Sequence, residues 1–518
     1  MTKKPSAPTP PSSEETADDL RQVAGGASLA FVGRLGALIE ALSVVVFTWA
    51  YGAETFGLFA VLWSYVKVST ALSDAAMTTA LQRFVPRVAK KDEASVAGFA
   101  LKLSFLLACA FAGLGTYYAP AISQFINVGA EDQAHLTNVI RIYVWVLPFW
   151  TIVEVGTAAI RARRKFGPEI RVRIFYEQGL RLIAAIVFFY FGLNTYGLFL
   201  AHLLSVVLAA ILALRLVALH YDMSDVLRAK FTGTIAKDMA KYGFTVMPSN
   251  LIKKLFSEFP VMLLNFMLPG AAGAAAGGYY AIARKLASAL QVVRLAFEYV
   301  MAPLAAEKDG KGDKHRLQHM YSFATRMSLC LALPFGAALY LARADILSAL
   351  EPGFQAAAAA IAILAAGRVL EAASGPSQSI VEMLGHRLLP PINGLIGLSI
   401  FIYLGWMLIP VHGVTGAAIA AAIGLNITAY LAFAQTALIF KLWPYTSETL
   451  KPAFVSLISA TVLVSLAEFG PRFPAPTGLI SAIFGLIVAL LALVRYGLKA
   501  EDAAALGKPG RWLSRAKK

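Results

Sequence analysis

The tetrapeptide Gly57-Leu58-Phe59-Ala60 recurs as Gly278-Tyr279-Tyr280-Ala281, about 220 residues further along the chain. The same spacing relates residues 197–201 to residues 416–420, more loosely. Each of these segments opens a long apolar run after a short loop. An apolar chain that repeats itself in this way predicts two similar helical bundles with a path between them, which is a common plan of membrane transporters.

The composition indicates a membrane protein. Apolar residues make up 58% of the 518 residues and charged residues only 15%, whereas soluble domains carry roughly 25% charged residues. Apolar runs of about 20 residues, each long enough to cross a bilayer as a helix, follow one another along nearly the whole chain. Because helices satisfy their own backbone groups in lipid, we expect an all-α bundle. Strand-like alternation over ~10-residue stretches is absent, which argues against an outer-membrane barrel.

The apolar runs predict fourteen transmembrane helices. The predicted spans are residues 27–50, 57–80, 98–119, 139–160, 176–193, 197–218, 243–267, 277–303, 321–341, 355–383, 390–409, 415–440, 452–470 and 477–496. Basic residues gather in every second loop, whereas Arg343 and Arg472 are the basic residues of the other loops. This asymmetry predicts that the bare loops lie outside the cytoplasm and that both termini lie inside. The net charge of +16 then serves topology and contact with anionic headgroups rather than binding of nucleic acid.

The repeat divides the spans into two six-helix lobes, which we expect to form a pseudo-symmetric V, with two extra C-terminal helices. The predicted organisation is a disordered cytoplasmic tail (1–26), an N-terminal lobe (27–218), an amphipathic cytoplasmic linker (219–242), a C-terminal lobe (243–440), spans thirteen and fourteen (441–497) and a basic cytoplasmic tail (498–518).

Sequence motifs for cofactors and metals are missing. The chain contains no Walker A pattern and no glycine-rich loop after a strand, so we expect no cofactor. His315 and His319 have a spacing that can bind metal, but they fall in a charged loop, and we expect them to be solvated. Cys109 and Cys330 sit inside apolar runs and suggest neither a disulfide nor a metal site.

Ionisable residues within the spans are the informative anomaly, because charges in hydrocarbon are costly and usually face a cavity or a partner. They concentrate in spans one, two, seven, eight and ten. The predicted lining of a net-cationic, substrate-binding cavity is Arg34, Lys67, Lys253, Lys254, Arg284, Lys285, Arg294 and Arg368. The candidates for ion coupling, as partly desolvated carboxylates, are Asp74, Glu154, Glu258, Glu298 and Glu371.

Two interpretations of these charges stay open. In the first, neighbours on one helix face neutralise each other and only brace the bundle. Such pairs are Lys254 with Glu258, Arg294 with Glu298, and Arg368 with Glu371. In the second, the charges line a cationic cavity between the lobes. Arg34 and Lys254 keep the repeat spacing and could clamp a phosphate from both sides.

The stretch Tyr51–Ala60, followed by Asp74 and by Ala80-Leu81-Gln82-Arg83-Phe84-Val85-Pro86, resembles the N-terminal signature of Wzx-type polysaccharide flippases. These belong to the multidrug/oligosaccharidyl-lipid/polysaccharide (MOP) exporter superfamily and are related to lipid II flippases. The resemblance extends through the basic stretch Arg161–Arg173 and, as architecture, over residues 27–497.

The resemblance implies translocation of an undecaprenyl-diphosphate-linked oligosaccharide to the outer leaflet of the bacterial inner membrane, by alternating access, for O-antigen, capsule or exopolysaccharide biosynthesis. It also implies a monomer that contacts membrane lipids, with a polysaccharide polymerase and a chain-length regulator as partners. In lipid II flippases an arginine-rich cavity meets the diphosphate, and Arg34, Lys254, Arg284 and Arg294 occupy comparable helices.

The sequence leaves two other functions as alternatives. A drug or cation antiporter of the same superfamily is expected to have an acidic, aromatic cavity, whereas basic residues outnumber acids in spans seven and eight. A membrane polysaccharide polymerase or glycosyltransferase needs a large outer loop or an acidic metal site, and the predicted outer loops are short. We therefore expect a transporter and not an enzyme.

Overall fold

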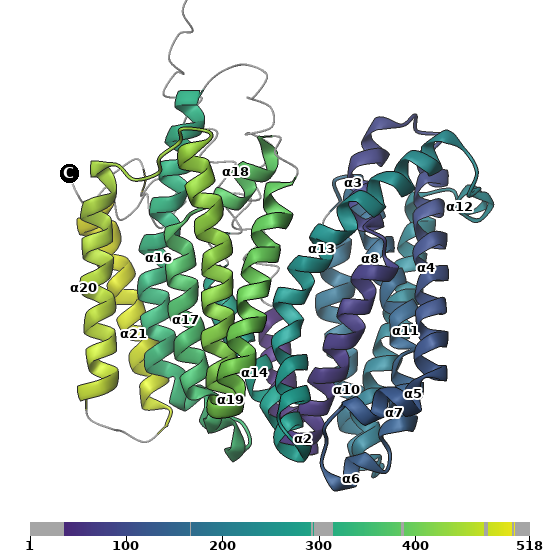
Figure 1. The fold of residues 1–518 in the computed structure, drawn as a ribbon, viewed down its shortest axis with the longest axis horizontal. Coiled ribbons are helices and arrows are strands. Elements are labelled where there is room, and N and C mark those ends of the chain that lie inside the picture. Colours follow the sequence, from purple (N-terminus) through teal and green to yellow (C-terminus); the bar gives the residue numbers. More distant parts are fainter. Residues whose placement is uncertain are drawn as a thin grey trace, which may run out of the picture.

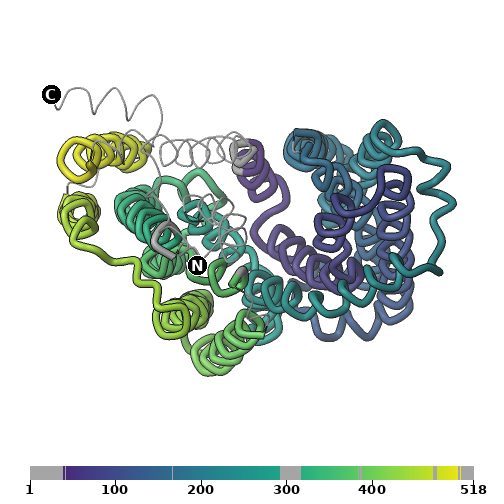
Figure 2. The backbone as a smooth tube through the Cα atoms, turned by 90° about the horizontal axis from the view of Figure 1, so that it is seen from above, coloured from purple at the N-terminus to yellow at the C-terminus, as the bar shows by residue number. Residues whose placement is uncertain are grey.

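The computed structural model describes residues 36–165, 167–291, 294, 314–384, 388–470, 475–499 and 502. Helices account for the regular secondary structure of these residues, as the sequence predicts. Figures 1 and 2 show two helical bundles side by side, with the N-terminal half of the chain in one and the C-terminal half in the other. The described part of the chain therefore has the expected two-lobed form.

The helices follow the predicted order. The N-terminal lobe contains α2 (Gly36–Ser73), α3 (Met77–Phe84), α4 (Glu93–Tyr117), α5 (Ala119–Ile122), α6 (Ala130–Gln133), α7 (Leu136–Tyr143), α8 (Val146–Ala162), α9 (Gly167–Ile170), α10 (Glu177–Tyr190) and α11 (Asn194–His220). After α12 (Met223–Arg228), the C-terminal lobe contains α13 (Thr234–Met267), α14 (Gly270–Ser288), α16 (Lys314–Ser348), α17 (Ala358–Ala373), α18 (Ser377–Met383) and α19 (Leu389–Leu438). The helices α20 (Ser447–Phe469) and α21 (Thr477–Ala492) lie at the outer edge of this lobe (Figure 2).

Two of the helices are hairpins that turn at a single glycine. Gly52 in α2 and Gly413 in α19 have φ angles of 77° and 52°, a region that glycine adopts without strain. The rings of Phe47 and Phe59 meet across the first turn. Nine helical segments of the described chain are long and apolar enough to span a membrane. Because the hairpins α2 and α19 each contain two spans, these nine segments account for eleven spans. The helices α10, α13 and α14 add three more, so the predicted fourteen-span architecture is confirmed.

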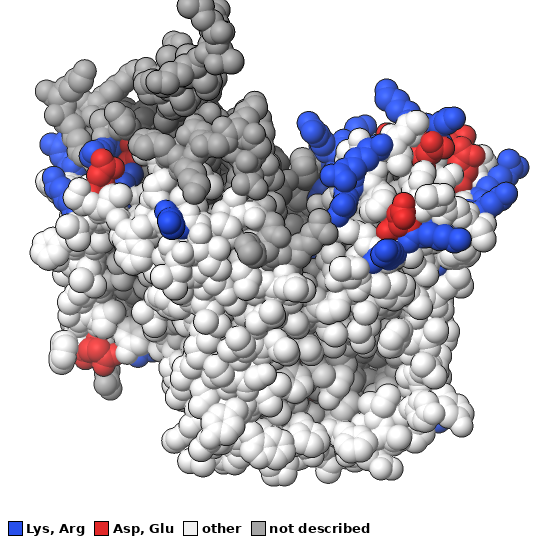
Figure 3. All heavy atoms as spheres, turned by 45° about the horizontal axis from the view of Figure 1, so that its top comes forward, with Lys and Arg blue, Asp and Glu red and all other residues white. Residues whose placement is uncertain are grey.

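The two ends of the bundle differ in charge. Basic loops after α3, α8 and α12 lie at one end, which we call the charged end, and blue side chains crowd it in Figure 3. The opposite or bare end holds the turns at Gly52 and Gly413 and the loop between α13 and α14. The basic loops predicted from the sequence thus lie together at one end of the molecule, and the loops with few charges lie at the other.

The lobes meet at the bare end through backbone atoms. A Cβ atom at Gly57 would lie 2.0 Å from the carbonyl oxygen of Ala274, and one at Gly278 would lie 3.0 Å from the Cα of Gly57. Only glycine allows α2 and α14 to approach so closely. Gly57 and Gly278, the matched first residues of the sequence repeat, therefore contact each other across the boundary between the lobes.

A buried arginine fastens the last helices to the C-terminal lobe. Arg326 of α16 is 3% exposed, and its guanidinium lies 2.8 Å from Asp502 Oδ1 and 3.2 Å from Glu448 Oε2 at the start of α20. Lys499 Nζ also pairs with Glu448, at 2.5 Å. We call this group the C-terminal clasp.

Two expectations about local structure were wrong. Residues 219–242 do not form one amphipathic helix, because α11 continues to His220, α12 is short and α13 begins at Thr234. His315 and His319 lie on the first turns of α16 rather than in a loop. His319 is exposed, and no group of potential metal ligands is found among the described residues.

Candidate functional site

Charged side chains from both lobes meet where α2 packs against α13 and α14. Glu258 of α13 accepts from Lys67 Nζ of α2 and from Arg284 of α14, whose Nη1 lies 3.2 Å from Oε1. The side chain of Glu258 is 4% exposed and that of Lys67 is 15% exposed. One carboxylate between two cations leaves this group, which we call the interlobe cluster, with a net positive charge.

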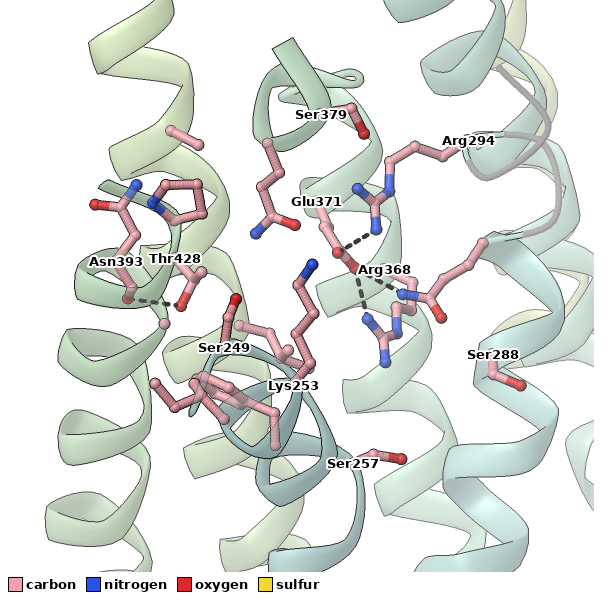
Figure 4. A pocket seen from close by; sticks show the side chains of 18 of the residues that line it. Ser249, Lys253, Ser257, Ser288, Arg294, Arg368, Glu371, Ser379, Asn393 and Thr428 are labelled. Atoms are coloured by element: carbon pink, nitrogen blue, oxygen red, sulfur yellow. Dashed lines mark hydrogen bonds and ion pairs between the residues drawn. The ribbon is translucent and has the colours of Figure 1, made fainter. Parts of the chain in front are cut away.

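A second cluster of the same kind lies within the C-terminal lobe. Glu371 of α17 pairs with Arg368 at 2.6 Å and with Arg294 at 2.7 Å, and Gln291 Nε2 donates to it at 3.4 Å. Figure 4 shows Arg294 and Arg368 converging on Glu371 from two sides. We call these three ionisable residues the C-lobe cluster. Burial in a medium of low dielectric strengthens such pairs but requires them to be well matched.

A cavity of about 510 Å³ opens beside the C-lobe cluster between α13, α14, α17, α18 and α19. Four basic side chains and two acidic side chains line it: Lys253, Arg284, Arg294, Arg368, Glu371 and Glu382. Ser249, Ser257 and Thr428 also line it with hydroxyl groups (Figure 4). Cations together with hydroxyl donors suit an anionic, hydrogen-bonding ligand.

A smaller cavity of about 150 Å³ lies between the lobes and is also rich in cations. Its charged lining comprises Glu40, Lys67, Arg181, Arg284 and Lys285. Lys285 pairs with Glu40 across the boundary at 2.8 Å. Arg284 lines both cavities, so the two cation-rich spaces share one guanidinium.

Most of the predicted site residues are brought together, and some are not. Lys67, Lys253, Arg284, Lys285, Arg294, Arg368, Glu258 and Glu371 line the two cavities or pair with residues that do. Lys254 is half-buried on α13 and does not line either cavity. Arg34 and Glu298 lie outside the described residues, so the predicted clamp of Arg34 with Lys254 stays a prediction.

Asp74 and Glu154 lie apart from both clusters. Asp74 sits in the turn between α2 and α3, where Thr78 Oγ1 donates to its carboxylate at 2.8 Å. Glu154 on α8 pairs with Arg173 at 3.2 Å. Both carboxylates are therefore engaged inside the N-terminal lobe, and their role in ion coupling remains a prediction.

The predicted pairs on one helix face have mixed outcomes. The pair Arg368–Glu371 is confirmed at 2.6 Å. The pair Lys254–Glu258 was wrong, because Glu258 turns to Lys67 and Arg284 instead. Arg294 and Glu298 cannot be compared, since Glu298 lies outside the described residues. Bracing within a helix and a cavity between helices therefore coexist.

Sequence reasoning missed a buried network in the N-terminal lobe. Glu177 of α10 lies 3.4 Å from Arg181 and 3.6 Å from Nε2 of His202, a residue of α11 that is fully buried. The hydroxyl of Tyr143 lies 2.8 Å from the other ring nitrogen of His202. The signal in the sequence was a lone histidine inside the apolar run 197–218.

The bare end is closed by a reciprocal amide pair between the lobes. Asn127 Nδ2 donates to the carbonyl oxygen of Asn265 at 2.8 Å, and Asn265 Nδ2 donates to that of Asn127 at 2.6 Å. The backbone N–H of Asn127 also donates to Asn265 Oδ1 at 3.2 Å. Asn265 is 1% exposed.

Replacing Asn265 with alanine should weaken this closure. The change removes the partners of the backbone N–H and carbonyl oxygen of half-buried Asn127, which costs about 1–3 kcal/mol, so we expect a lower thermal midpoint of unfolding for the purified protein. The matched control is Asn250→Ala on the same helix, whose amide makes a 3.4 Å contact with Thr79. Equal midpoints for the two variants would contradict the closing role of Asn265.

Comparisons with known proteins agree with this architecture. A family model described as "polysaccharide biosynthesis protein" matches residues 52–350. The structure is similar to that of the lipid II flippase MurJ in an inward closed conformation, with a TM-score of 0.70 and 14% identity over 90% of this chain and 97% of that chain.

It is also similar to an inward-facing multidrug resistance MATE family transporter of the MOP superfamily, with a TM-score of 0.63 and 16% identity over 79% of this chain and 94% of that chain. The search of curated proteins found no match. At these identities the solved structures support the fold, and the family model carries the assignment.

Proposed function

Because the chain belongs to the polysaccharide biosynthesis protein family, as the resemblance to Wzx-type flippases implied, we propose that it moves an undecaprenyl-diphosphate-linked oligosaccharide across a bacterial inner membrane. Its family and fold are those of membrane transporters rather than enzymes. The proposed cargo has an anionic diphosphate, a polar glycan and a long apolar tail, and each part needs a different environment.

The observation that carries the proposal is the excess of cations around the two cavities. Each cluster holds one buried glutamate between two basic side chains, so the cavities keep positive charge for an incoming anion. Arginine binds phosphate through two parallel hydrogen bonds, and lysine adds a mobile point charge. Serine hydroxyl groups around the larger cavity supply partners for sugar hydroxyls.

The outer faces of α20 and α21 are apolar surfaces beside which the lipid tail of the cargo could lie. Only 22% of the most apolar stretch of each helix is buried inside the protein, whereas 50% or more is buried in the apolar spans Leu42–Ser73, Glu93–Tyr117, Leu136–Ala162 and Asn194–His220 of the N-terminal lobe. Large apolar side chains such as Phe454 and Phe484 are 64% and 68% exposed. A polyprenyl tail can therefore remain in lipid beside these helices while the headgroup enters the protein.

The division of charge suggests the orientation of transport. We place the charged end in the cytoplasm, because basic loops are retained on that side, and the bare end on the outer face. Both termini then lie in the cytoplasm, and the bare-end contacts between the lobes close the outer exit. A polysaccharide polymerase and a chain-length regulator are the partners we expect to act after release.

The function is tested by deleting the gene and measuring which leaflet holds the lipid-linked glycan. We expect the double variant Arg284→Gln/Arg368→Gln to deliver at least about tenfold less glycan to the outer leaflet, since each arginine lost removes a charge-assisted bond of about 1.5–3 kcal/mol. The control is Arg87→Gln, an exposed arginine at the charged end. Unchanged delivery in the deletion strain, with no redundant exporter present, would rule the flippase out.

A cation or drug antiporter is the second candidate, favoured by the similarity to a MATE family transporter. The same deletion strain separates the two functions. An antiporter predicts normal glycan delivery together with greater sensitivity to cationic dyes. The flippase predicts the reverse pattern.

A further inference from the structure

Glu258 is surrounded as a bound anion would be. Its Oε2 atom accepts from Lys67 and, at 3.0 Å, from Ser64 Oγ, while its Oε1 atom accepts from Arg284 at 3.2 Å and from Ser257 Oγ at 2.9 Å. Two cations and two hydroxyl groups therefore hold one carboxylate. This donor set also fits a phosphate group, because phosphate binds the same cations and hydroxyls through similar oxygens.

These contacts connect the two lobes. Lys67 and Ser64 belong to α2 of the N-terminal lobe, whereas Glu258 and Arg284 belong to α13 and α14 of the C-terminal lobe. Lys67 and Arg284 also line the cavity between the lobes. An anion that enters this cavity thus meets both of the cations that Glu258 now holds.

A second ionic link between the lobes, among the residues that the structure describes, is weaker. The side chains of Lys285 and Glu40, although 2.8 Å apart, are 42% and 34% exposed, and exposed pairs contribute little. Glu258 is nearly buried and bonded through both oxygens, so breaking its pair with Lys67 changes the link between the lobes far more.

We propose that Glu258 is a built-in placeholder for the anionic group of the substrate. A diphosphate that binds Lys67 and Arg284 displaces the carboxylate and breaks the ion pair that ties α2 to α13, which frees the lobes to move. The inference rests on the proposed function, since it needs an anionic cargo. It also makes Glu258 a selectivity residue, because a neutral or cationic molecule cannot replace a carboxylate at two cations.

The test uses the purified full-length protein and inorganic pyrophosphate as the probe, with two measurements. Calorimetry gives the affinity. Spin labels at Ala89→Cys and Ser447→Cys, exposed positions at the charged ends of the two halves, give the distance between them, after Cys109 and Cys330 are replaced by serine. In the wild type, pyrophosphate should widen this distance.

Glu258→Gln should bind pyrophosphate about tenfold more tightly, a change of about 1.4 kcal/mol, because the competing charge is gone. It should also show the wider distance without pyrophosphate. The matched control is Glu371→Gln, which removes the same charge inside one lobe. We expect this control to tighten binding but to leave the distance as in the wild type.

Lys67→Met covers the case in which Glu258→Gln does not fold. It breaks the same ion pair from the other side, so the distance should again widen, but pyrophosphate should bind more weakly. If pyrophosphate binds and the distance is unchanged in the wild type or in Glu258→Gln, the placeholder is overturned and the proposed function stands. If pyrophosphate binds to none of these proteins, the anionic cavity and the placeholder are both overturned.

Discussion

Replacing Gly57 with alanine is expected to reduce glycan delivery to background. The added Cβ would lie 2.0 Å from the carbonyl oxygen and 2.5 Å from the carbonyl carbon of Ala274. Both atoms are backbone and cannot rotate away, so α2 and α14 must separate and the bare end must open. Overpacking usually costs about 1–3 kcal/mol, and we expect the upper part of this range, measured as a lower thermal midpoint together with the leaflet distribution of the glycan.

The matched control is Gly113→Ala in α4, where no atom lies within 4 Å of the new Cβ. Alanine favours a helix over glycine by about 1 kcal/mol, so this variant should be at least as stable as the wild type and fully active. If Gly57→Ala also transports normally, the backbone contact between the lobes is not needed for closure.

Replacing Arg326 with alanine is the second change with a large expected effect. It leaves Asp502 buried without its cation and removes a partner of Glu448, so the C-terminal clasp loses its centre. Breaking a buried ion pair in this way costs about 3–5 kcal/mol. We expect a much lower midpoint of unfolding, and faster proteolysis in the loop of residues 439–446, as α20 loosens from α16.

Lys499→Ala provides the comparison for this prediction. Lys499 pairs with the same Glu448, but its side chain is 60% exposed, and exposed pairs contribute about 0–1 kcal/mol. The midpoint should therefore change little. A similar loss for both variants would mean that the clasp is stabilised by its surface contacts and not by burial of Arg326.

Hydropathy and loop charge were sufficient to predict the helical order, because lipid imposes long apolar helices and the basic loops mark one end. They could not predict how tight the turns are. The loops expected near residues 51–56 and 410–414 are reduced to turns at Gly52 and Gly413, where glycine adopts the positive φ without strain. Span two was also expected to run to residue 80, but α2 ends at Ser73 and Asp74 bonds Thr78 of the next helix.

The site was predictable as a set of residues but not as a set of contacts. Helical spacing correctly paired Arg368 with Glu371, because both partners lie on one helix. The same rule failed for Lys254 and Glu258, since the other lobe offers Lys67 as a partner at this point. Helical spacing in the sequence predicts ion pairs within one helix, whereas ion pairs between helices depend on how the helices pack.

The contact between Gly57 and Gly278 also has a consequence for the passage of ions between the lobes. The atoms that meet at this crossing belong largely to the main chain, and main-chain atoms neither titrate nor change rotamer. This contact does not depend on a protonation state, so we expect it to persist when pH or salt changes. Among the described residues, it also brings no polar side chain to this crossing, so the contact itself cannot distinguish one solute from another.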